Sequence, residues 1–229
     1  MSIKTLNERL DAIKLLMEYA VPEKHKKEAL ALVKKHEGDT VALNVFHTFY
    51  SFLPEAADDY IKILRLLARK EGAFLICATT GLGDYLYLST SERAELLGNL
   101  EAGIMDEEIL EFFGFESQEA FKKAHSELSR FPVYVPTHLH EKLCPVCHAA
   151  EGEYHTLGCP IEVCPWCGGQ LTSCDCRFTQ LGVSELDEEG QLDALLARLK
   201  EKGRIPFDAA TQKPSYPSAP PQEAGVKDN

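Results

Sequence analysis

The sequence lacks any run of apolar residues long enough to span a bilayer. Its first residues, MSIKTLNERLDAIKLL, are charged and lack the apolar segment of a secretory signal. Together these absences argue against a membrane or secreted protein and predict a cytoplasmic one. Outside residues 144–176 the chain has a single cysteine, Cys77. A buried cysteine among apolar neighbours usually packs as a small hydrophobe, and we expect this of Cys77.

Positive charge is scarce where a nucleic-acid interface would need it. The formal net charge is −12, and residues 136–183 carry two basic side chains, Lys142 and Arg177, against five acidic ones. Proteins that bind the phosphate backbone of nucleic acids need clustered Lys and Arg. Seven thiolates holding two divalent ions would make this segment still more negative. Nucleic-acid binding by this segment is therefore disfavoured.

The strongest signal is a cluster of seven of the eight cysteines within residues 144–176. In a reducing compartment, clustered cysteines bind metal more often than they form disulfides. A two-residue spacer lets both sulfurs of a Cys-x-x-Cys turn point at one ion, and this spacing occurs twice. With one histidine the cysteines make eight ligands, enough for two tetrahedral Zn²⁺ sites: Cys144, Cys147, His155, Cys159, Cys164, Cys167, Cys174 and Cys176.

Two partitions of these ligands are open. Sequential pairing places the first four ligands on one ion and the last four on the other, and its short loops cost less closure entropy. Interleaving would pair the two Cys-Pro-x-Cys turns across a sixteen-residue loop, as in a zinc ribbon, and a single occupied site is a third option. His148 is a weaker ligand candidate than His155, and His138 and His140 are expected to be linker residues.

The run from His155 to Cys176, HTLGCPIEVCPWCGGQLTSCDC, preceded by Cys144-Pro-Val-Cys147, carries a resemblance. It is similar to a cysteine-rich zinc-ribbon-like module of uncharacterised bacterial and phage proteins. The likeness covers 33 of 229 residues. It implies zinc, and it implies no reaction or substrate.

A closed ligand set argues against zinc catalysis, because a catalytic zinc keeps one position open for water. His125-Ser-Glu127 followed by Cys144 and Cys147 only faintly echoes a zinc deaminase motif, since Leu143 replaces the expected proline. Redox use of the Cys-x-x-Cys turns is disfavoured by the lack of a thioredoxin-like βαβ pattern. No catalytic residue is assigned.

The first 135 residues predict a mainly helical domain. Apolar periodicity and capping residues predict helices over 5–20 and 22–38 and a fourth helix from Pro54 to Gly72. After Asp39, residues 40–53 are rich in β-branched and aromatic side chains that fit helix or strand, and their length without a turn signal favours a buried helix. A β-hairpin is predicted over 73–89, where Gly81 and Gly83 fit a turn far better than a phosphate loop. Further helices are predicted over 91–100, 107–115 and 118–128, the last two capped by Asp106 and Ser117.

The segment FPVYVPTHLH, residues 131–140, is predicted to form an extended linker into the cysteine segment. A zinc-binding module is predicted over 136–182, and it closes with a strand at 177–182. Asp187 is predicted to cap a helix ending near Lys202, within a C-terminal unit over 183–205, whose leucine stripe should pack on the N-terminal domain or on a partner. Residues 206–229 are proline-rich and predict a disordered tail. The fold class is therefore α+β, mainly α.

Three functions follow from these observations. The leading hypothesis is a non-enzymatic zinc-binding protein whose module is structural and supports contact with another protein. A zinc-dependent, hydrolase-like enzyme is the alternative, and a regulator that binds nucleic acid is the third.

Overall fold

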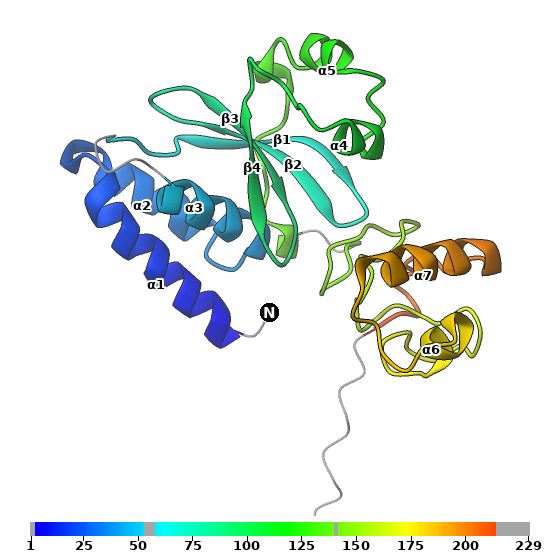
Figure 1. The fold of residues 1–229 in the computed structure, drawn as a ribbon. Helices are drawn as coiled ribbons and strands as arrows, with labels where there is room; N and C mark the ends of the chain where they lie inside the picture. Colours follow the sequence, from blue (N-terminus) through cyan, green and yellow to red (C-terminus); the bar gives the residue numbers. More distant parts are fainter. Residues whose placement is uncertain (1–2, 53–57, 140–141, 214–229) are drawn as a thin grey trace, which may run out of the picture.

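A four-stranded antiparallel sheet organises the N-terminal part of the chain (Figure 1). The structure is a computed structural model that describes residues 3–52, 58–139 and 142–213. Strands lie in the sheet in the order in which they occur in the sequence: β1 (Ile63–Lys70), β2 (Ala73–Thr79), β3 (Asp84–Ser89) and β4 (Ala94–Asn99). The predicted hairpin is confirmed, because β2 and β3 pair from Phe74–Ser89 to Thr79–Asp84.

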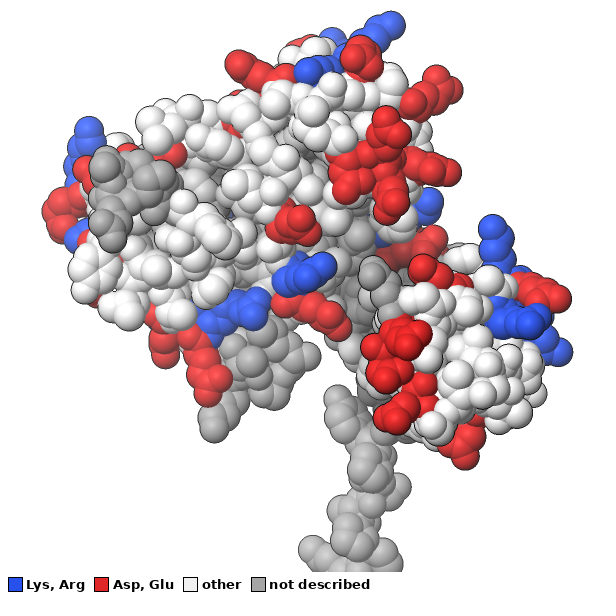
Figure 2. All heavy atoms as spheres, in the orientation of Figure 1, with Lys and Arg blue, Asp and Glu red and all other residues white. Residues whose placement is uncertain are grey.

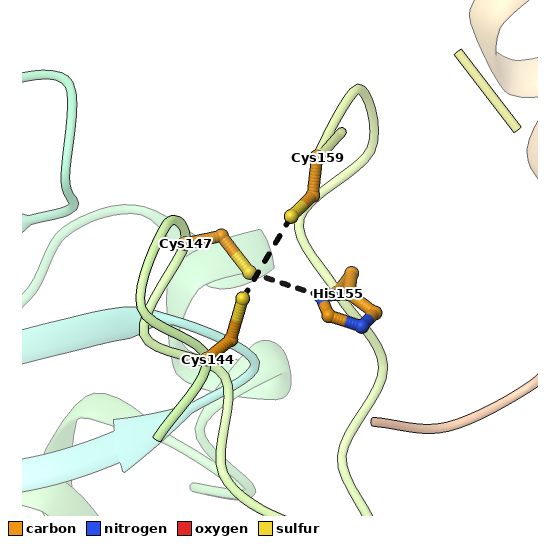
Figure 3. Close-up of side chains that lie close together, drawn as sticks. All are labelled: Cys144, Cys147, His155 and Cys159. Carbon is orange, nitrogen blue, oxygen red and sulfur yellow. Dashed lines mark hydrogen bonds between the residues drawn. The ribbon is translucent and has the colours of Figure 1, made fainter. Parts of the chain in front are cut away.

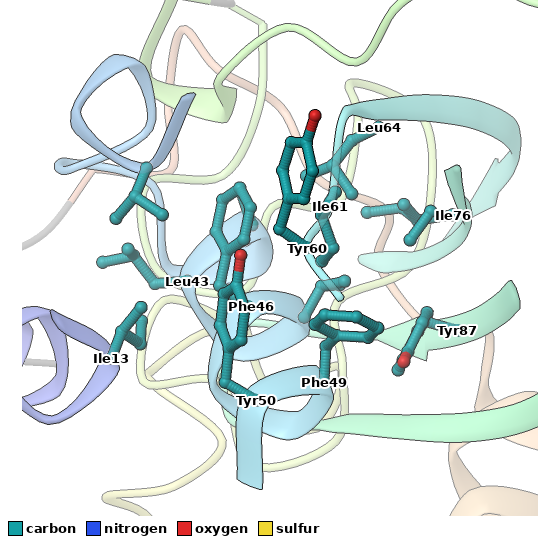
Figure 4. Close-up of a cluster of buried hydrophobic side chains, with 14 of the residues drawn as sticks. Ile13, Leu43, Phe46, Phe49, Tyr50, Tyr60, Ile61, Leu64, Ile76 and Tyr87 are labelled. Atoms are coloured by element: carbon teal, nitrogen blue, oxygen red, sulfur yellow. The ribbon is translucent and has the colours of Figure 1, made fainter. Parts of the chain in front are cut away.

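Three helices lie on one side of this sheet, and all three were predicted: α1 (Ile3–Ala20), α2 (Lys26–Lys35) and α3 (Thr40–Phe52). Helix α3 packs on β3 and β4, and α1 packs on α3. A 3-10 turn, Glu23–His25, precedes α2. Phe46 of α3 is fully buried among Leu64, Ile76 and other strand residues (Figure 4). The apolar stripe of α1 supplies Ile13 to the same core.

The opposite face is covered by α4 (Glu107–Phe112), α5 (Gln118–Ala124) and a 3-10 turn at Leu128–Arg130. Asp106 and Ser117 cap the two helices as predicted. Cys77 is fully buried in this second core, so its packing role is confirmed, and burial raises the pKa of its thiol to about 12. Since β2 is covered on both faces, its apolar run is continuous.

Two predicted helices are strands. The segment from Ile63 to Lys70 is β1, and Ala94–Asn99 is β4; residues 53–57, including Pro54, lie outside the described part of the chain. In β1, Leu64 packs against one core and Leu67 against the other, so their three-residue spacing imitates a helical period. A register shift between Leu66 and Ala68 breaks the alternation further. The N-terminal domain is therefore richer in sheet than the sequence indicated.

The described part of the predicted linker, residues 131–139, is packed into the domain instead of extended away from it. Tyr134 is buried, and its hydroxyl donates to the carboxylate of Asp39 at 3.0 Å. The backbone N–H and the hydroxyl of Thr137, at the start of the 3-10 turn Thr137–Leu139, donate to the same carboxylate. Asp39 also caps α3 as predicted, accepting from Ala42 N at 2.7 Å. One buried carboxylate thus joins the start of α3 to the segment leading toward the cysteines.

The C-terminal part differs from the sequence prediction in three places. Residues 177–181 belong to the helix α6 (Cys176–Leu181), not to a strand, and α7 (Glu189–Lys202) is capped by Glu188 instead of Asp187. Residues 206–213 are not a disordered tail, because Phe207 and Gln212 are buried; residues 214–229 lie outside the described part. No helix among the described residues is long and apolar enough to cross a membrane.

Candidate metal centre

The two Cys-Pro-x-Cys segments fold into turns of the same geometry. In the first turn, Cys144 N donates to Ala149 O at 2.8 Å and His148 N donates to Cys144 O at 2.9 Å. In the second turn, Cys164 N donates to Gly169 O at 2.7 Å and Gly168 N donates to Cys164 O at 2.9 Å.

Each turn requires a positive φ after its second cysteine. Gly168 has φ 75° without a steric cost, whereas His148 has φ 62°. A non-glycine residue in this region is uncommon and is held there by its surroundings. The His148 ring lies edge-on to Phe74 of β2, with the centroids 6.3 Å apart. His148 therefore contacts the sheet and is not among the clustered ligand atoms.

The structure brings the eight predicted ligands together as two groups of four, in sequential order: Cys144, Cys147, His155 and Cys159, then Cys164, Cys167, Cys174 and Cys176. Within each group all the ligand atoms lie within 4.8 Å of one another. Both groups could hold a metal ion, and the interleaved partition is not the one observed. The side chain of His138 and all of His140 lie outside the described residues.

The spacing of the first group fits a tetrahedral zinc site (Figure 3). The Cys144 and Cys159 sulfurs are 3.8 Å apart, and the Cys147 sulfur lies 3.3 Å from Nδ1 of His155. Zn–S bonds of about 2.3 Å in a regular tetrahedron place two sulfurs about 3.8 Å apart, and a sulfur and a nitrogen about 3.5 Å apart. All four side chains are buried. A disulfide would need its two sulfurs at about 2.0 Å.

Electrostatics of the first group favour a bound cation. The pKa of the Cys144 thiol is lowered to about 3, first by hydrogen bonds from the Cys147 and Cys159 thiols and then by the backbone N–H groups of Cys147 and Val146. The pKa of Cys159 is raised, chiefly by its hydrogen bond to Cys144. Buried sulfurs this close cannot all ionise without a compensating positive charge. A divalent ion would supply that charge and let all three thiols act as thiolates.

Gln212 holds the imidazole of His155 in the orientation that a ligand needs. His155 Nε2 lies 2.8 Å from Gln212 Oε1, and Gln212 Nε2 donates to Pro206 O at 3.0 Å. Because a carbonyl oxygen can only accept, the Pro206 bond fixes the amide, and the proton of His155 is placed on Nε2. Nδ1 is then the unprotonated nitrogen, and it faces the cysteines. Such a partner is typical of metal-bound histidines.

Replacing Gln212 by alanine is expected to weaken metal binding at the first group by about 10–100-fold, because the imidazole loses the acceptor that fixes its tautomer and orientation. Competition with a chromophoric zinc chelator measures this affinity. Gln212→Glu should restore much of it, since a carboxylate also accepts from Nε2–H. Gln180→Ala, at an exposed position of α6, is the matched control and should bind zinc as the wild type does. Equal affinities for Gln212→Ala and Gln180→Ala would contradict this role.

A buried ion pair ties the chain after α7 to the segment between the two groups. Arg204 Nε donates to Glu162 Oε1 at 2.7 Å, and Arg204 Nη2 donates to His155 O. The Glu162 side chain is 1% exposed. Burial raises the pKa of Glu162, and the neighbouring Arg204 opposes that rise. Glu162 lies in the sequence between a ligand of each group, so this pair fixes the groups relative to the C-terminal segment.

The second group is organised by α6 and α7 and is more open. Cys176 begins α6, and Cys164 is fully buried beside Leu171. Leu195 and Leu199 of α7 pack onto this cluster. The leucine stripe of α7 thus covers the second group, not the N-terminal domain, while Leu192 and Leu196 stay partly exposed.

The turn between β1 and β2 docks onto the first group. Glu71 N donates to Glu153 Oε2 at 3.2 Å, and Thr156 Oγ1 donates to Glu71 O at 3.3 Å. Gly72 has φ 79°, and a Cβ atom at this position would lie 2.2 Å from Cys147 O. Only glycine fits this close approach, so Gly72 lets the turn contact the loop that carries Cys147.

Gly72→Ala is expected to destabilise the protein by about 2–4 kcal/mol, from an unfavourable φ and from a clash with the Cys147 carbonyl. Urea unfolding followed by circular dichroism measures the loss. Gly114→Ala is the control, because Gly114 has φ 81° with nothing within 4 Å of the added Cβ. That control should lose only the φ contribution, about 1–2 kcal/mol. Equal losses in the free energy of unfolding of the two variants would show that the contact of Gly72 with Cys147 contributes nothing to stability.

Three residues of the centre were missed by the sequence interpretation: Gln212, Arg204 and Glu162. Glu162 and Arg204 have no ligand spacing to mark them, and Gln212 lies in a segment whose prolines predict disorder. The local signal that could have indicated order there is Phe207, an aromatic residue that packs beside Cys144 and Ile161.

Comparisons with protein-family models, with curated proteins and with solved structures find no match for this chain.

Proposed function

We propose that this is a zinc-binding protein in which two closed zinc sites build a structural module, residues 142–213, on the side of an α+β domain. The observation that carries this proposal is the assembly of eight thiol and imidazole ligands into two groups of four. In the first group, the separations match those of a tetrahedral thiolate site. Cysteine-rich four-ligand sets favour Zn²⁺ over harder ions such as Mg²⁺ or Ca²⁺.

A structural role is favoured over a catalytic one by the number of ligands. Three cysteines and a histidine, or four cysteines, fill a tetrahedron and leave no position for a water molecule. Glu162, the buried acid nearest in sequence to both groups, is paired with Arg204 and so is not placed as a free base. The zinc ions would replace the hydrophobic core that a segment of this size cannot build alone.

The chelator response of the module tests the structural role. Removing zinc is expected to unfold residues 142–213 and to leave the sheet domain folded. Trp166, the single tryptophan, lies in the second Cys-Pro-x-Cys turn, so its fluorescence reports on the module. Far-ultraviolet circular dichroism follows the helices of the whole chain, and on zinc removal it should lose only the signal of α6 and α7. A protein that binds no zinc, or a module whose melting is unchanged by chelator, would refute the structural role.

The module is further proposed to contact another protein. Supporting this, Leu192 of α7 is 41% exposed and lines a groove of about 430 Å³ together with Phe178, Leu186 and others. Leu196, on the same helix, is 37% exposed. Acidic side chains are prominent over α4 and on the module in the face shown by Figure 2. Residues 142–213 carry eleven acidic against seven basic side chains, and this negative balance disfavours nucleic acid.

The double variant Leu192→Asp with Leu196→Asp tests this contact, because both leucines are partly exposed and the change should spare the fold. The variant should keep its zinc and its melting temperature but lose a partner that copurifies with the wild type. Leu15→Asp, an exposed leucine of α1, is the control and should retain the partner. Retention by the double variant would place the contact elsewhere. Binding to DNA or RNA that falls steeply with salt would instead support the nucleic-acid alternative.

A further inference from the structure

The two ligand groups differ in their access to solvent. In the first group, Cys144, Cys147 and Cys159 are 0–4% exposed. In the second group Cys164 is fully buried, but Cys167 is exposed, and Cys174 and Cys176 are half-buried. A small reagent can therefore reach the sulfurs of the second group in the folded protein. The sulfurs of the first group would become accessible only after local opening.

The groups also differ in the charge that a bound divalent ion would leave. Four thiolates around Zn²⁺ carry a net charge of −2, whereas three thiolates and a neutral imidazole carry −1. A less neutralised sulfur is the better nucleophile, since reactivity follows thiolate character. Both the exposure of its sulfurs and its net charge therefore make the second group the more reactive one.

We propose that the second group, Cys164, Cys167, Cys174 and Cys176, is a site of reversible oxidation by hydroperoxides, and that oxidation expels its zinc and releases α7. This inference rests on the proposed zinc-binding function. It assigns to the second group a regulatory role that the buried first group does not share.

The chemistry balances with hydrogen peroxide as the oxidant. One thiolate attacks a peroxide oxygen, the O–O bond breaks, and a sulfenic acid and a hydroxide ion form. A second thiolate attacks the sulfenic sulfur, forms the S–S bond and expels a second hydroxide ion. Each pair of thiolates thus gives two electrons to one peroxide molecule. Two such events convert four thiolates into two disulfides, and Zn²⁺ leaves because its anionic ligands are gone.

The structural consequence would reach beyond the oxidised cysteines. Leu195 and Leu199 of α7 pack on Cys164 and Leu171, so α7 loses its packing surface when this group rearranges. The chain continues from α7 through Gly203 to Arg204, which holds Glu162 and the His155 carbonyl. Release of α7 would thereby weaken the contacts of Arg204 with Glu162 and with the His155 carbonyl, beside the first group.

The test uses the full-length, zinc-loaded protein treated with hydrogen peroxide. Released zinc is followed with a chromophoric chelator, and each cysteine is scored by differential alkylation and mass spectrometry. One zinc per chain should leave about tenfold faster than the other, since the buried group must open first. Disulfides should form within the second group while Cys144, Cys147 and Cys159 stay reduced. The buried Cys77 is an internal control and should also stay reduced.

Hydrogen exchange supplies a readout that does not depend on the cysteines. Amides of α7 should exchange faster after oxidation, and a dithiol with added zinc should restore their protection. Oxidation of both groups at one rate, or of the first group before the second, would overturn the proposal. Absence of zinc before peroxide is added would instead overturn the underlying zinc-binding function, so the two failures are distinguishable.

Discussion

Replacing Cys147 by serine is expected to reduce the bound zinc from two ions per chain to one and to unfold the loops of the first group. Its sulfur contacts the ligand nitrogen of His155, and its carbonyl lies against Gly72. Structural zinc contributes on the order of 10–16 kcal/mol to the folding of small zinc-dependent peptides. No rearrangement of the local core, which is chiefly Cys144, Ile161 and Phe207, can replace that contribution. Zinc released on denaturation, counted with a chelator dye, measures the outcome.

Cys164→Ser is the companion variant and should lose the other ion. It should also abolish the chelator response of Trp166 fluorescence, which Cys147→Ser should retain. Cys77→Ala is the control for loss of a buried sulfur, because Cys77 packs in the sheet domain away from either group. It should keep two zinc ions and lose only about 1 kcal/mol of stability. If either serine variant still bound two ions, the replaced cysteine would not be a required ligand.

Asp39→Ala is expected to destabilise the sheet domain by about 4 kcal/mol. The buried carboxylate accepts from Ala42 N, the Tyr134 hydroxyl and two groups of Thr137. Removing it leaves several buried donors without a partner, each at a cost of about 1–3 kcal/mol, part of which structural relaxation recovers. Urea unfolding followed by circular dichroism gives the change in the free energy of unfolding.

Two further variants make the Asp39 result interpretable. Asp58→Ala removes an exposed carboxylate and should change stability by less than about 0.5 kcal/mol. Tyr134→Phe deletes one donor to Asp39, keeps the ring, and should cost about 1–2 kcal/mol. A loss for Asp39→Ala no larger than that for Asp58→Ala would show that the carboxylate does not organise this junction.

The clustering of the eight candidate ligands could be predicted from the sequence because ligand chemistry is local. A Cys-x-x-Cys spacing determines how two sulfurs meet one ion, whatever surrounds them. Short loops also favoured the sequential grouping that the structure adopts. The orientation of His155 was not predictable in this way, since it depends on Gln212, fifty-seven residues further along the chain.

The strands β1 and β4 were mistaken for helices because their stability comes from distant partners. Residues of β1 face two different cores, which removes the alternation that marks a half-buried strand. The sequence of β4, AELLGN, contains good helix formers, yet pairing with β3 and packing on α3 determine its conformation. Helices α1 and α2 bury one face each, so their periodicity predicted them correctly. Helix α3 is buried at every position from Val41 to Phe46, and its length without a turn signal predicted it.

The wrong predictions in the C-terminal part, a strand at 177–182 and disorder from residue 206, also arise from contacts that the local sequence does not show. Helix α6 has only six residues, too few for a periodic signal, although Gly182 in a left-handed conformation marks its end. Residues 206–213 carry little apolar content, and their order comes from Phe207 and Gln212 packing beside the first ligand group. Composition indicates disorder where no core is available, but here the buried cluster around Cys144 and Ile161 supplies one.

Metal analysis of the purified protein combined with zinc X-ray absorption tests the central claim most directly. The account predicts two zinc ions per chain, every ion four-coordinate, with seven sulfur ligands and one nitrogen ligand shared between them. A chain without zinc, or a zinc ion with an oxygen ligand from water, would contradict two closed structural sites.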